Sequence, residues 1–212
     1  TDEEMAQVAA ELAAASGGTC VAMALDVLEE AQVQAVVAAT VERFGRLDIL
    51  VNNAGIGYLM KALVDIDAKE GDAVLGVNLR GAFLCTQAFG AHVLQAGGGS
   101  IVNIGSIAAG KPNASPAYSV SKAGVLALTR HTAVEWGPRG VRTNAVSPGF
   151  IRTPMVEEGL GEEALAGIAA LHPIGRLGTP QEVAALTLFL LSDRASFITG
   201  SYHLVDGAYA AQ

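Results

Sequence analysis

Two kinds of apolar pattern alternate along the chain: stretches with the period of an α-helix and short stretches that are apolar throughout. The helical period predicts helices from the first residues to about 17, and over 33–44, 68–96 with interruptions, 117–136, 161–171 and 180–191. The short apolar stretches predict buried strands over 20–25, 49–51, 100–104, 141–146 and 202–205. Strand and helix therefore follow one another along almost the whole chain.

This alternation predicts an α/β fold. Strands joined through helices run parallel, and too few units are present for an eight-unit barrel, so we expect a doubly wound, Rossmann-like parallel sheet. The hydrophobic fraction of 51% and the aromatic fraction of only 5% suit strands buried on both faces beneath closely packed helices. With 212 residues and no linker or repeat, residues 1–212 are expected to form one domain.

Charge and termini argue against several functional classes. The formal net charge is −8 and no block of Lys or Arg is present, which argues against nucleic acid as a partner. No apolar run reaches the roughly 18 residues of a membrane span, and the acidic opening Thr1–Glu4 is the opposite of a signal peptide. We therefore expect a cytoplasmic protein with no membrane partner.

Cysteine and histidine do not indicate a metal site. Cys20 and Cys85 are too few for a disulfide framework, and neither lies in a Cys-x-x-Cys or Cys/His cluster. The four histidines are scattered without ligand spacing, at His92, His131, His172 and His203. We interpret them as structural.

Polar and small residues follow three of the predicted strands. These segments are 52–55, 105–106 and 147–153. In an open α/β sheet, chemistry gathers beyond the carboxyl ends of the strands, which makes these loops the place for a site. Taken singly, each segment is equally typical of an ordinary turn.

Tyr118 and Lys122 are spaced i, i+4 and should be neighbours on one face of the helix predicted over 117–136. A phenol is mostly protonated at neutral pH and is a poor base. An ammonium about 5 Å away would stabilise the phenolate by roughly 3 kcal/mol and lower the pKa of Tyr118. Such a tyrosine can exchange a proton with an alcohol or ketone oxygen. A pair at this spacing can also be an ordinary i, i+4 contact on a helix surface, without a catalytic role.

Ser106 stands at the end of the strand predicted over 100–104 and can hydrogen-bond the same substrate oxygen. A hydrolase nucleophile would require a Gly-x-Ser-x-Gly elbow, and the sequence around Ser106 lacks one. Together with Tyr118, Ser106 indicates a site for a carbonyl group.

In order and rough spacing, these motifs resemble those of the short-chain dehydrogenase/reductase family. The motifs are Asn52-Asn53-Ala54-Gly55, Asn78, Ser106, Tyr118-x-x-x-Lys122 and Pro148-Gly149, with further matches in 26–27, 77–83, 173–182, 198–200 and 205–207. The resemblance covers the whole chain. It implies an NAD- or NADP-dependent oxidoreductase that interconverts a small secondary alcohol and its ketone.

The resemblance also implies roles for individual residues. Tyr118 would be the acid/base, Lys122 would lower its pKa and hold the nicotinamide ribose, Ser106 would fix the substrate oxygen, and Asn78 would anchor a water-linked proton relay. The implied cofactor contacts are Asp26 and Val27 beside adenine, Asn53, Ala54 and Gly55 on the adenosine side, Pro148 and Gly149, and Ile151 and Thr153 against the carboxamide and phosphates. A homotetramer is implied, with the helix over 117–136 and the final strand as interfaces.

The sequence departs from the family at its start. The family begins with a strand, a glycine-rich turn and a helix whose N-terminus receives the pyrophosphate, and the chain as given lacks this first strand–helix–strand unit. We therefore expect that a further N-terminal segment belongs to the natural protein. The residue that selects NAD or NADP would lie in that segment, so the cofactor preference is left open.

Two alternatives to this activity stay open. The chain could be a non-catalytic or truncated family member that acts as a binding or scaffold protein, which cofactor binding would distinguish. It could also be a 3-oxoacyl-acyl-carrier-protein reductase, which we would expect to carry a basic docking patch. The segments 111–116 and 155–172 are expected to select the substrate.

Overall fold

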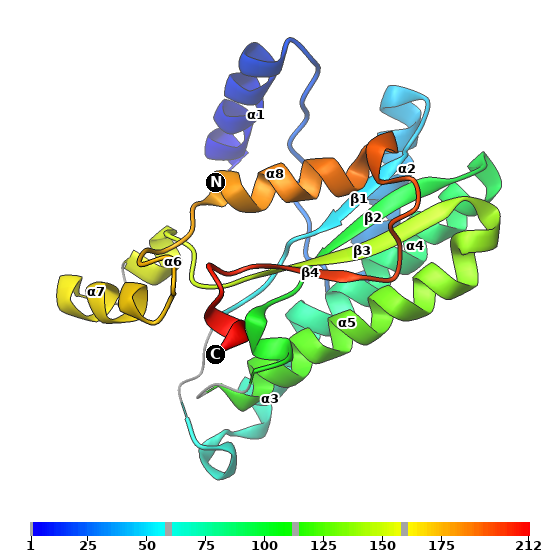
Figure 1. The fold of residues 1–212 in the computed structure, drawn as a ribbon. Coiled ribbons are helices and arrows are strands. Elements are labelled where there is room, and N and C mark those ends of the chain that lie inside the picture. Colours follow the sequence, from blue (N-terminus) through cyan, green and yellow to red (C-terminus); the bar gives the residue numbers. More distant parts are fainter. Residues whose placement is uncertain (1, 58–60, 112–114, 158–160) are drawn as a thin grey trace.

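The computed structural model describes residues 2–57, 61–111, 115–157 and 161–212. It contains a four-stranded parallel sheet in the order β1-β2-β3-β4, formed by Ile49–Asn52, Gly99–Ile104, Val141–Pro148 and Tyr202–Val205. The register pairs Val51 with Val102, Val102 with Asn144, and Ala145 with Tyr202. The predicted parallel α/β fold is therefore confirmed (Figure 1).

Helices connect these strands and lie on both faces of the sheet. The helices are α1 Asp2–Ser16, α2 Glu30–Phe44, α3 Ala68–Leu75, α4 Ala82–Ala96, α5 Pro116–Trp136, α6 Pro154–Glu157, α7 Glu162–Ala170 and α8 Pro180–Leu191. A π-helix joins α3 to α4, and it accounts for the predicted interruption; its bounds are Gly76–Gly81. Short 3₁₀ turns occupy Leu63–Asp65, Ile107–Ala109, Gly137–Arg139, Asp193–Ala195 and Tyr209–Ala211. All the predicted helices are present.

The core is divided between the two faces of the sheet. On one face α4 and α5 contribute to a buried cluster made of Phe89, Val93, Ile101, Trp136 and Val141. On the other face Leu190 of α8 packs on Val102 and Val146. Neighbouring residues of β2 thus point to opposite faces, as strand geometry requires. This arrangement is doubly wound, with α8 on one side and α4 and α5 on the other (Figure 1).

Local sequence signals explain where several of these helices begin and end. Gly45, which ends α2, and Gly97, which ends α4, adopt left-handed φ values of 75° and 101°. The predicted capping box before α8 is present, because Thr179 and Glu182 exchange hydrogen bonds between side chain and backbone. The two glycines thus end the helices just before β1 and β2, and the capping box marks the start of α8.

The strand predicted over 20–25 is wrong. Residues 19–26 are outside any helix or strand of the structure, and Val21 and Leu25 are exposed. Within the described ranges β1 pairs only with β2, and Ile49 and Val51 on β1 remain 47% and 40% exposed. An apolar, β-prone segment becomes a strand only when its backbone groups find a partner strand. The segment 20–25 is apolar, but it is not paired with any described strand of the sheet.

Candidate functional site

A cavity of about 160 Å³ lies at the carboxyl ends of β1, β2 and β3. Its lining residues are Asn53, Gly55, Ile56, Gly57, Ile104, Gly105, Ser106, Tyr118, Lys122, Pro148 and Gly149. Larger hollows of about 830 and 970 Å³ lie between α2 and α4 and beside α5, lined by helix surface residues. The smaller cavity is the candidate site, because ligands of open α/β sheets bind at the carboxyl ends of the strands.

Lys122 is held in place by the end of β2. Its ammonium donates a hydrogen bond to the Ile104 carbonyl at 2.8 Å and is 5.7 Å from the centre of the Tyr118 ring. The side chain is buried, with 5% of the residue exposed. Burial lowers the pKa of the Lys122 ammonium to about 8. Near neutral pH the ammonium therefore stays mostly charged beside Tyr118.

Asn78 lies on the π-helix and is 1% exposed. Its Oδ1 accepts from the Ile56 backbone N–H at 2.8 Å, and its Nδ2 donates to the Ile56 carbonyl at 3.2 Å and to Ser121 Oγ at 3.2 Å. Ser121 Oγ in turn donates to the Tyr118 carbonyl at 2.7 Å. One amide thus ties the loop after β1 to α5 one turn from Tyr118.

Ser121 is a site-supporting residue that the sequence interpretation missed. It is fully buried and joins Asn78 to the backbone of Tyr118. Its position three residues after Tyr118 places both on one face of α5, which is the signal that identifies it. Its polar bonds explain why a serine can occupy a buried position there.

Ser106 begins the 3₁₀ turn Ile107–Ala109 that follows β2. Its Oγ accepts a hydrogen bond from the Ala108 backbone N–H at 3.1 Å, and the residue is 6% exposed. A hydroxyl that accepts from the backbone keeps its proton for donation. Ser106 and Tyr118 line the same cavity, so a carbonyl oxygen placed there can meet two hydroxyl groups.

Glycines shape two walls of the cavity. A Cβ at Gly55 would lie 3.3 Å from Asn78 Oδ1 and 3.7 Å from Lys122 Nζ. A Cβ at Gly149 would lie 2.9 Å from the Asp206 Cα and 3.2 Å from His172 Nε2. At both positions the backbone packs closely against its neighbours.

The segment after β3 is anchored to the turn before α8. Ile151 forms a β-bridge with Gly178, and the Gly178 N–H donates to the Phe150 carbonyl at 3.0 Å. The Arg152 N–H donates to the Gly178 carbonyl at 2.9 Å. The conformation of this segment thus depends on the turn that carries Gly178.

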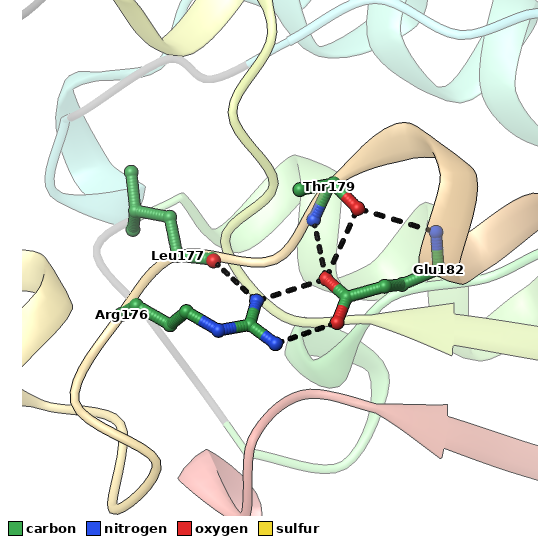
Figure 2. A network of polar contacts seen from close by, with 4 residues as sticks. All are labelled: Arg176, Leu177, Thr179 and Glu182. Carbon is green, nitrogen blue, oxygen red and sulfur yellow. Dashed lines mark hydrogen bonds and ion pairs between the residues drawn. The ribbon is translucent and has the colours of Figure 1, made fainter.

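A network of polar contacts fixes that turn (Figure 2). The Arg176 guanidinium donates to both Glu182 carboxylate oxygens at 3.0 and 2.7 Å and to the Leu177 carbonyl at 3.1 Å. The Thr179 N–H and hydroxyl also donate to Glu182 Oε2 at 2.8 and 3.1 Å. The bonds from Arg176 and then from Thr179 lower the pKa of Glu182 to about 2. The carboxylate is therefore ionised throughout the neutral range.

The remaining residues of the sequence hypothesis lie outside the cavity wall. Asp26 and Val27 lie in the turn before α2, where the Leu28 N–H donates to Asp26 Oδ1 at 2.9 Å. Ala54, Ile151 and Thr153 are also absent from the lining set given above. Parts of the two predicted substrate-selecting segments, 112–114 and 158–160, lie outside the described residues.

Within residues 2–57, 61–111, 115–157 and 161–212, no group of three His, Cys, Asp or Glu residues is arranged to hold a metal ion. None of the helices in these ranges is both long and apolar enough to cross a membrane.

Comparison with known proteins gives the family. A model of short-chain dehydrogenases described as enoyl-(acyl carrier protein) reductase matches residues 1–210. The chain belongs to the short-chain dehydrogenase/reductase family. Membership makes it an oxidoreductase that uses a nicotinamide cofactor.

Individual members of this family cover most of the chain. A cyclohexanol dehydrogenase of Acinetobacter sp. (strain SE19) is 41% identical over 99% of this chain and 82% of its own length. The 3-oxoacyl-[acyl-carrier-protein] reductase FabG of Thermotoga maritima is 43% identical over 86% of this chain and 74% of its own. The solved structure "ElxO with NADP Bound" superposes with a TM-score of 0.85 at 36% identity, covering 89% of this chain and 77% of that one.

The cavity suits the nicotinamide and ribose end of such a cofactor. Its groups are an ammonium, a phenol, a serine hydroxyl and an amide, which match ribose hydroxyls and a carboxamide. Gly55 and Gly149 contribute only backbone to the cavity wall. The residues that surround the cavity therefore fit the cofactor that the family uses.

Proposed function

We propose that this dehydrogenase interconverts a small secondary alcohol and its ketone by hydride transfer, with Tyr118, Lys122, Ser106 and Asn78 as its site. The observation that carries the proposal is that Tyr118, Lys122 and Ser106 line one cavity at the carboxyl edge of a parallel sheet. A phenol, an ammonium and a hydroxyl around one small space are the groups that alcohol oxidation requires.

Tyr118 exchanges the proton. In oxidation its phenolate removes the hydroxyl proton of the alcohol, and in reduction its phenol protonates the carbonyl oxygen. The positive charge of the Lys122 ammonium, 5.7 Å from the ring centre, stabilises the negative charge of the phenolate. The Ile104 carbonyl keeps that ammonium in place.

Ser106 orients the substrate oxygen. Because Ser106 Oγ already accepts a hydrogen bond from the Ala108 N–H, the hydroxyl proton can be donated to the substrate oxygen in the cavity. A hydrogen bond to the carbonyl oxygen stabilises the charge that develops there during reduction. The short turn that Ser106 begins fixes the position of this donor.

Asn78 keeps the site assembled and anchors the proton relay that returns Tyr118 to its starting state. Its bonds to both backbone groups of Ile56, and through Ser121 to Tyr118, support this role. The loop after β1 and the start of α5 then move together. The Asn78 bonds therefore also keep Lys122 and the proton relay in fixed positions relative to Tyr118.

We assign the cofactor contacts to the same edge of the sheet. When bound, the nicotinamide supplies a hydride to the ketone or accepts one from the alcohol. Lys122 and Tyr118 would hold its ribose, and the other proposed contacts are Asn53, Ala54, Gly55, Pro148, Gly149, Ile151 and Thr153, with Asp26 and Val27 at the adenine end. Either NAD or NADP is compatible with these residues.

The substrate class is supported by the relatives. The cyclohexanol dehydrogenase, at 41% identity, acts on a cyclic secondary alcohol by its name. A second candidate is 3-oxoacyl-acyl-carrier-protein reduction, which the 43% identity to the Thermotoga maritima reductase favours. Comparing kcat/KM for cyclohexanone with that for a 3-oxoacyl-acyl-carrier protein distinguishes the two.

We also propose a homotetramer with α5 and β4 at its interfaces. Val120 and Val134 on α5 are 59% and 80% exposed, and Tyr202 and Leu204 on β4 are 47% and 46% exposed. Apolar side chains exposed on two separate elements support two distinct contacts between copies. Sedimentation equilibrium tests the proposal, and a monomer at micromolar concentration would contradict it.

The test of function begins with cofactor binding and ends with turnover. Quenching of Trp136 fluorescence would report cofactor binding poorly, because Trp136 lies roughly 27 Å along α5 from Tyr118, at about 1.5 Å per residue. The nicotinamide emission of NADH and NADPH reports binding directly. Tyr118→Phe should bind the cofactor but lower kcat at least ~100-fold, as the loss of a general acid/base does. Tyr202→Phe, which removes a hydroxyl on β4 outside the cavity lining, is the matched control and should leave kcat unchanged.

Either of two results would contradict this proposal. A folded chain that binds neither NADH nor NADPH would favour the non-catalytic binding or scaffold protein. Full turnover by Tyr118→Phe would remove Tyr118 from the chemistry.

A further inference from the structure

His172 uses both of its ring nitrogens inside the protein. It follows α7 and is 2% exposed. Nδ1 lies 2.8 Å from the Ile168 carbonyl, and Nε2 lies 3.4 Å from the Phe150 backbone nitrogen. A carbonyl only accepts, so Nδ1 carries the proton and Nε2 accepts from the Phe150 N–H. The ring therefore links the end of α7 to the segment after β3.

Aromatic packing surrounds this link. The His172 ring centre is 5.9 Å from that of Phe150, edge to face, and 5.1 Å from that of Tyr209. The Phe150 and Tyr209 centres are 5.7 Å apart. The three rings come from three segments that are distant in sequence, and edge contacts of this kind favour one relative orientation.

The C-terminal turn closes the arrangement. The Ile174 N–H donates to the Gly207 carbonyl at 3.3 Å, and the Gly149 N–H donates to the Val205 carbonyl at 3.0 Å. Lys111, which follows the turn begun by Ser106, donates to the Tyr209 carbonyl at 3.2 Å and lies 4.8 Å above the Tyr209 ring. The C-terminal turn thus contacts segments from two sides of the cavity.

We propose that His172 is a positioning residue for hydride transfer, because it holds the Gly149–Phe150 backbone against the cavity. Gly149 lines the cavity, and a Cβ there would lie only 3.2 Å from His172 Nε2. The anchor at Gly178 holds the far side of the same segment, at Ile151. His172 therefore determines where the Gly149 wall stands relative to Tyr118 and Lys122. This inference rests on the proposed function.

Two variants separate the hydrogen bonds from ring packing. His172→Phe keeps an aromatic ring between Phe150 and Tyr209 but removes both hydrogen bonds. His172→Gln restores an acceptor for the Phe150 N–H. His131→Gln, on the exposed surface of α5, is the matched control.

Three readouts are measured on the full chain: amide hydrogen exchange at Phe150, the Kd for NADH and NADPH from nicotinamide emission, and kcat and KM with cyclohexanone. His172→Phe should exchange the Phe150 amide at least ~10-fold faster. It should also raise the cofactor Kd and lower kcat by about 10-fold each, while the KM for cyclohexanone changes less. His172→Gln should recover most of each loss, and His131→Gln should match the wild type.

The outcomes separate this inference from the proposed function. If the wild type binds cofactor and His172→Phe has the same cofactor Kd and the same kcat, only the role of His172 is overturned. Equal losses in His172→Phe and His172→Gln that follow their melting temperatures would also overturn it, because they indicate only a structural role. No binding of either cofactor by the wild type would overturn the proposed function and this inference together.

Discussion

The cavity and the Asp26–Val27 turn, proposed to hold opposite ends of one cofactor, are built in different ways. Around the cavity, Asn78 and Lys122 are buried and bonded to backbone groups of other elements. Asp26 is exposed, and its carboxylate accepts from the N–H two residues along the chain. The buried side chains at the cavity are therefore held by tertiary contacts, whereas the Asp26 carboxylate is bonded within its own turn; the same turn meets the π-helix through its backbone, where Arg80 donates to the Leu28 carbonyl. Substitutions of the buried, bonded side chains at the cavity should affect stability and catalysis together, and loss of the exposed Asp26 carboxylate should affect neither strongly.

The largest expected effect is the loss of turnover in Lys122→Met. The substitution keeps a side chain of similar length and removes the charge that stabilises the phenolate of Tyr118. We expect kcat to fall by roughly 100-fold or more, the range of a lost acid/base contribution. Steady-state kinetics with NADH or NADPH measures it. An exposed lysine, Lys69→Met, is the control, and equal activity of the two variants would contradict the role of Lys122.

Lys122 should also impose a pH dependence on stability. Below pH 8 the lysine is charged in both folded and unfolded chains, and burial of the charge costs about 3 kcal/mol, from a pKa of about 8 against 10.5. Between pH 8 and 10.5 the unfolded chain binds the proton that the folded chain has released, so stability rises with pH. Urea unfolding of the wild type should show this rise, and Lys122→Met should lack it. Parallel pH profiles in both proteins would contradict the prediction.

Asn78→Ala should destabilise the fold by ~2 kcal/mol, because it removes a buried amide that bonds to the Ile56 backbone and to Ser121. Asn53→Ala is a control of the same residue type, because Asn53 lines the cavity but is exposed. It should cost less than ~0.5 kcal/mol, as surface substitutions do. Urea unfolding measures both variants. A cost for Asn53→Ala as large as that for Asn78→Ala would remove the distinction between buried and exposed amides.

The smallest effect is expected at Asp26→Ala. It removes one exposed hydrogen bond to the Leu28 N–H and should cost ~0.5 kcal/mol or less. Cofactor affinity should change only a few-fold, since an exposed contact at the adenine end contributes little. Asp65→Ala, another exposed carboxylate, is the reference for nicotinamide emission titrations. If Asp26→Ala loses as much cofactor affinity as a variant of a cavity residue, the expected difference between the turn and the cavity is contradicted.

Sequence patterns predicted most of this architecture for identifiable physical reasons. The four paired strands and the capping box before α8 follow from local periodicity and from residues that satisfy helix ends. The strand over 20–25 was wrong, because strand formation depends on a partner that periodicity does not describe. The π-helix that carries Asn78 was also outside prediction, since apolar spacing indicates helix but not its hydrogen-bond register.

The candidate site was predictable to the extent that its chemistry is local. The spacing of Tyr118 and Lys122 indicated neighbours on one helix face, and the structure places them so. Strand ends indicated where Ser106 and Gly149 would meet, and both line the cavity. His172 was interpreted only as structural, because its partners Phe150 and Tyr209 come together through tertiary contacts alone. Long-range packing is the part that a single sequence does not display.

The most direct test of the central claim is the oxidation of NADH or NADPH by cyclohexanone, followed by nicotinamide absorbance in the wild type and in Tyr118→Phe. We predict steady turnover by the wild type and a loss of at least ~100-fold in Tyr118→Phe, with cofactor still bound. Equal rates in the two proteins, or cofactor binding by the wild type without hydride transfer to any secondary ketone, would contradict it.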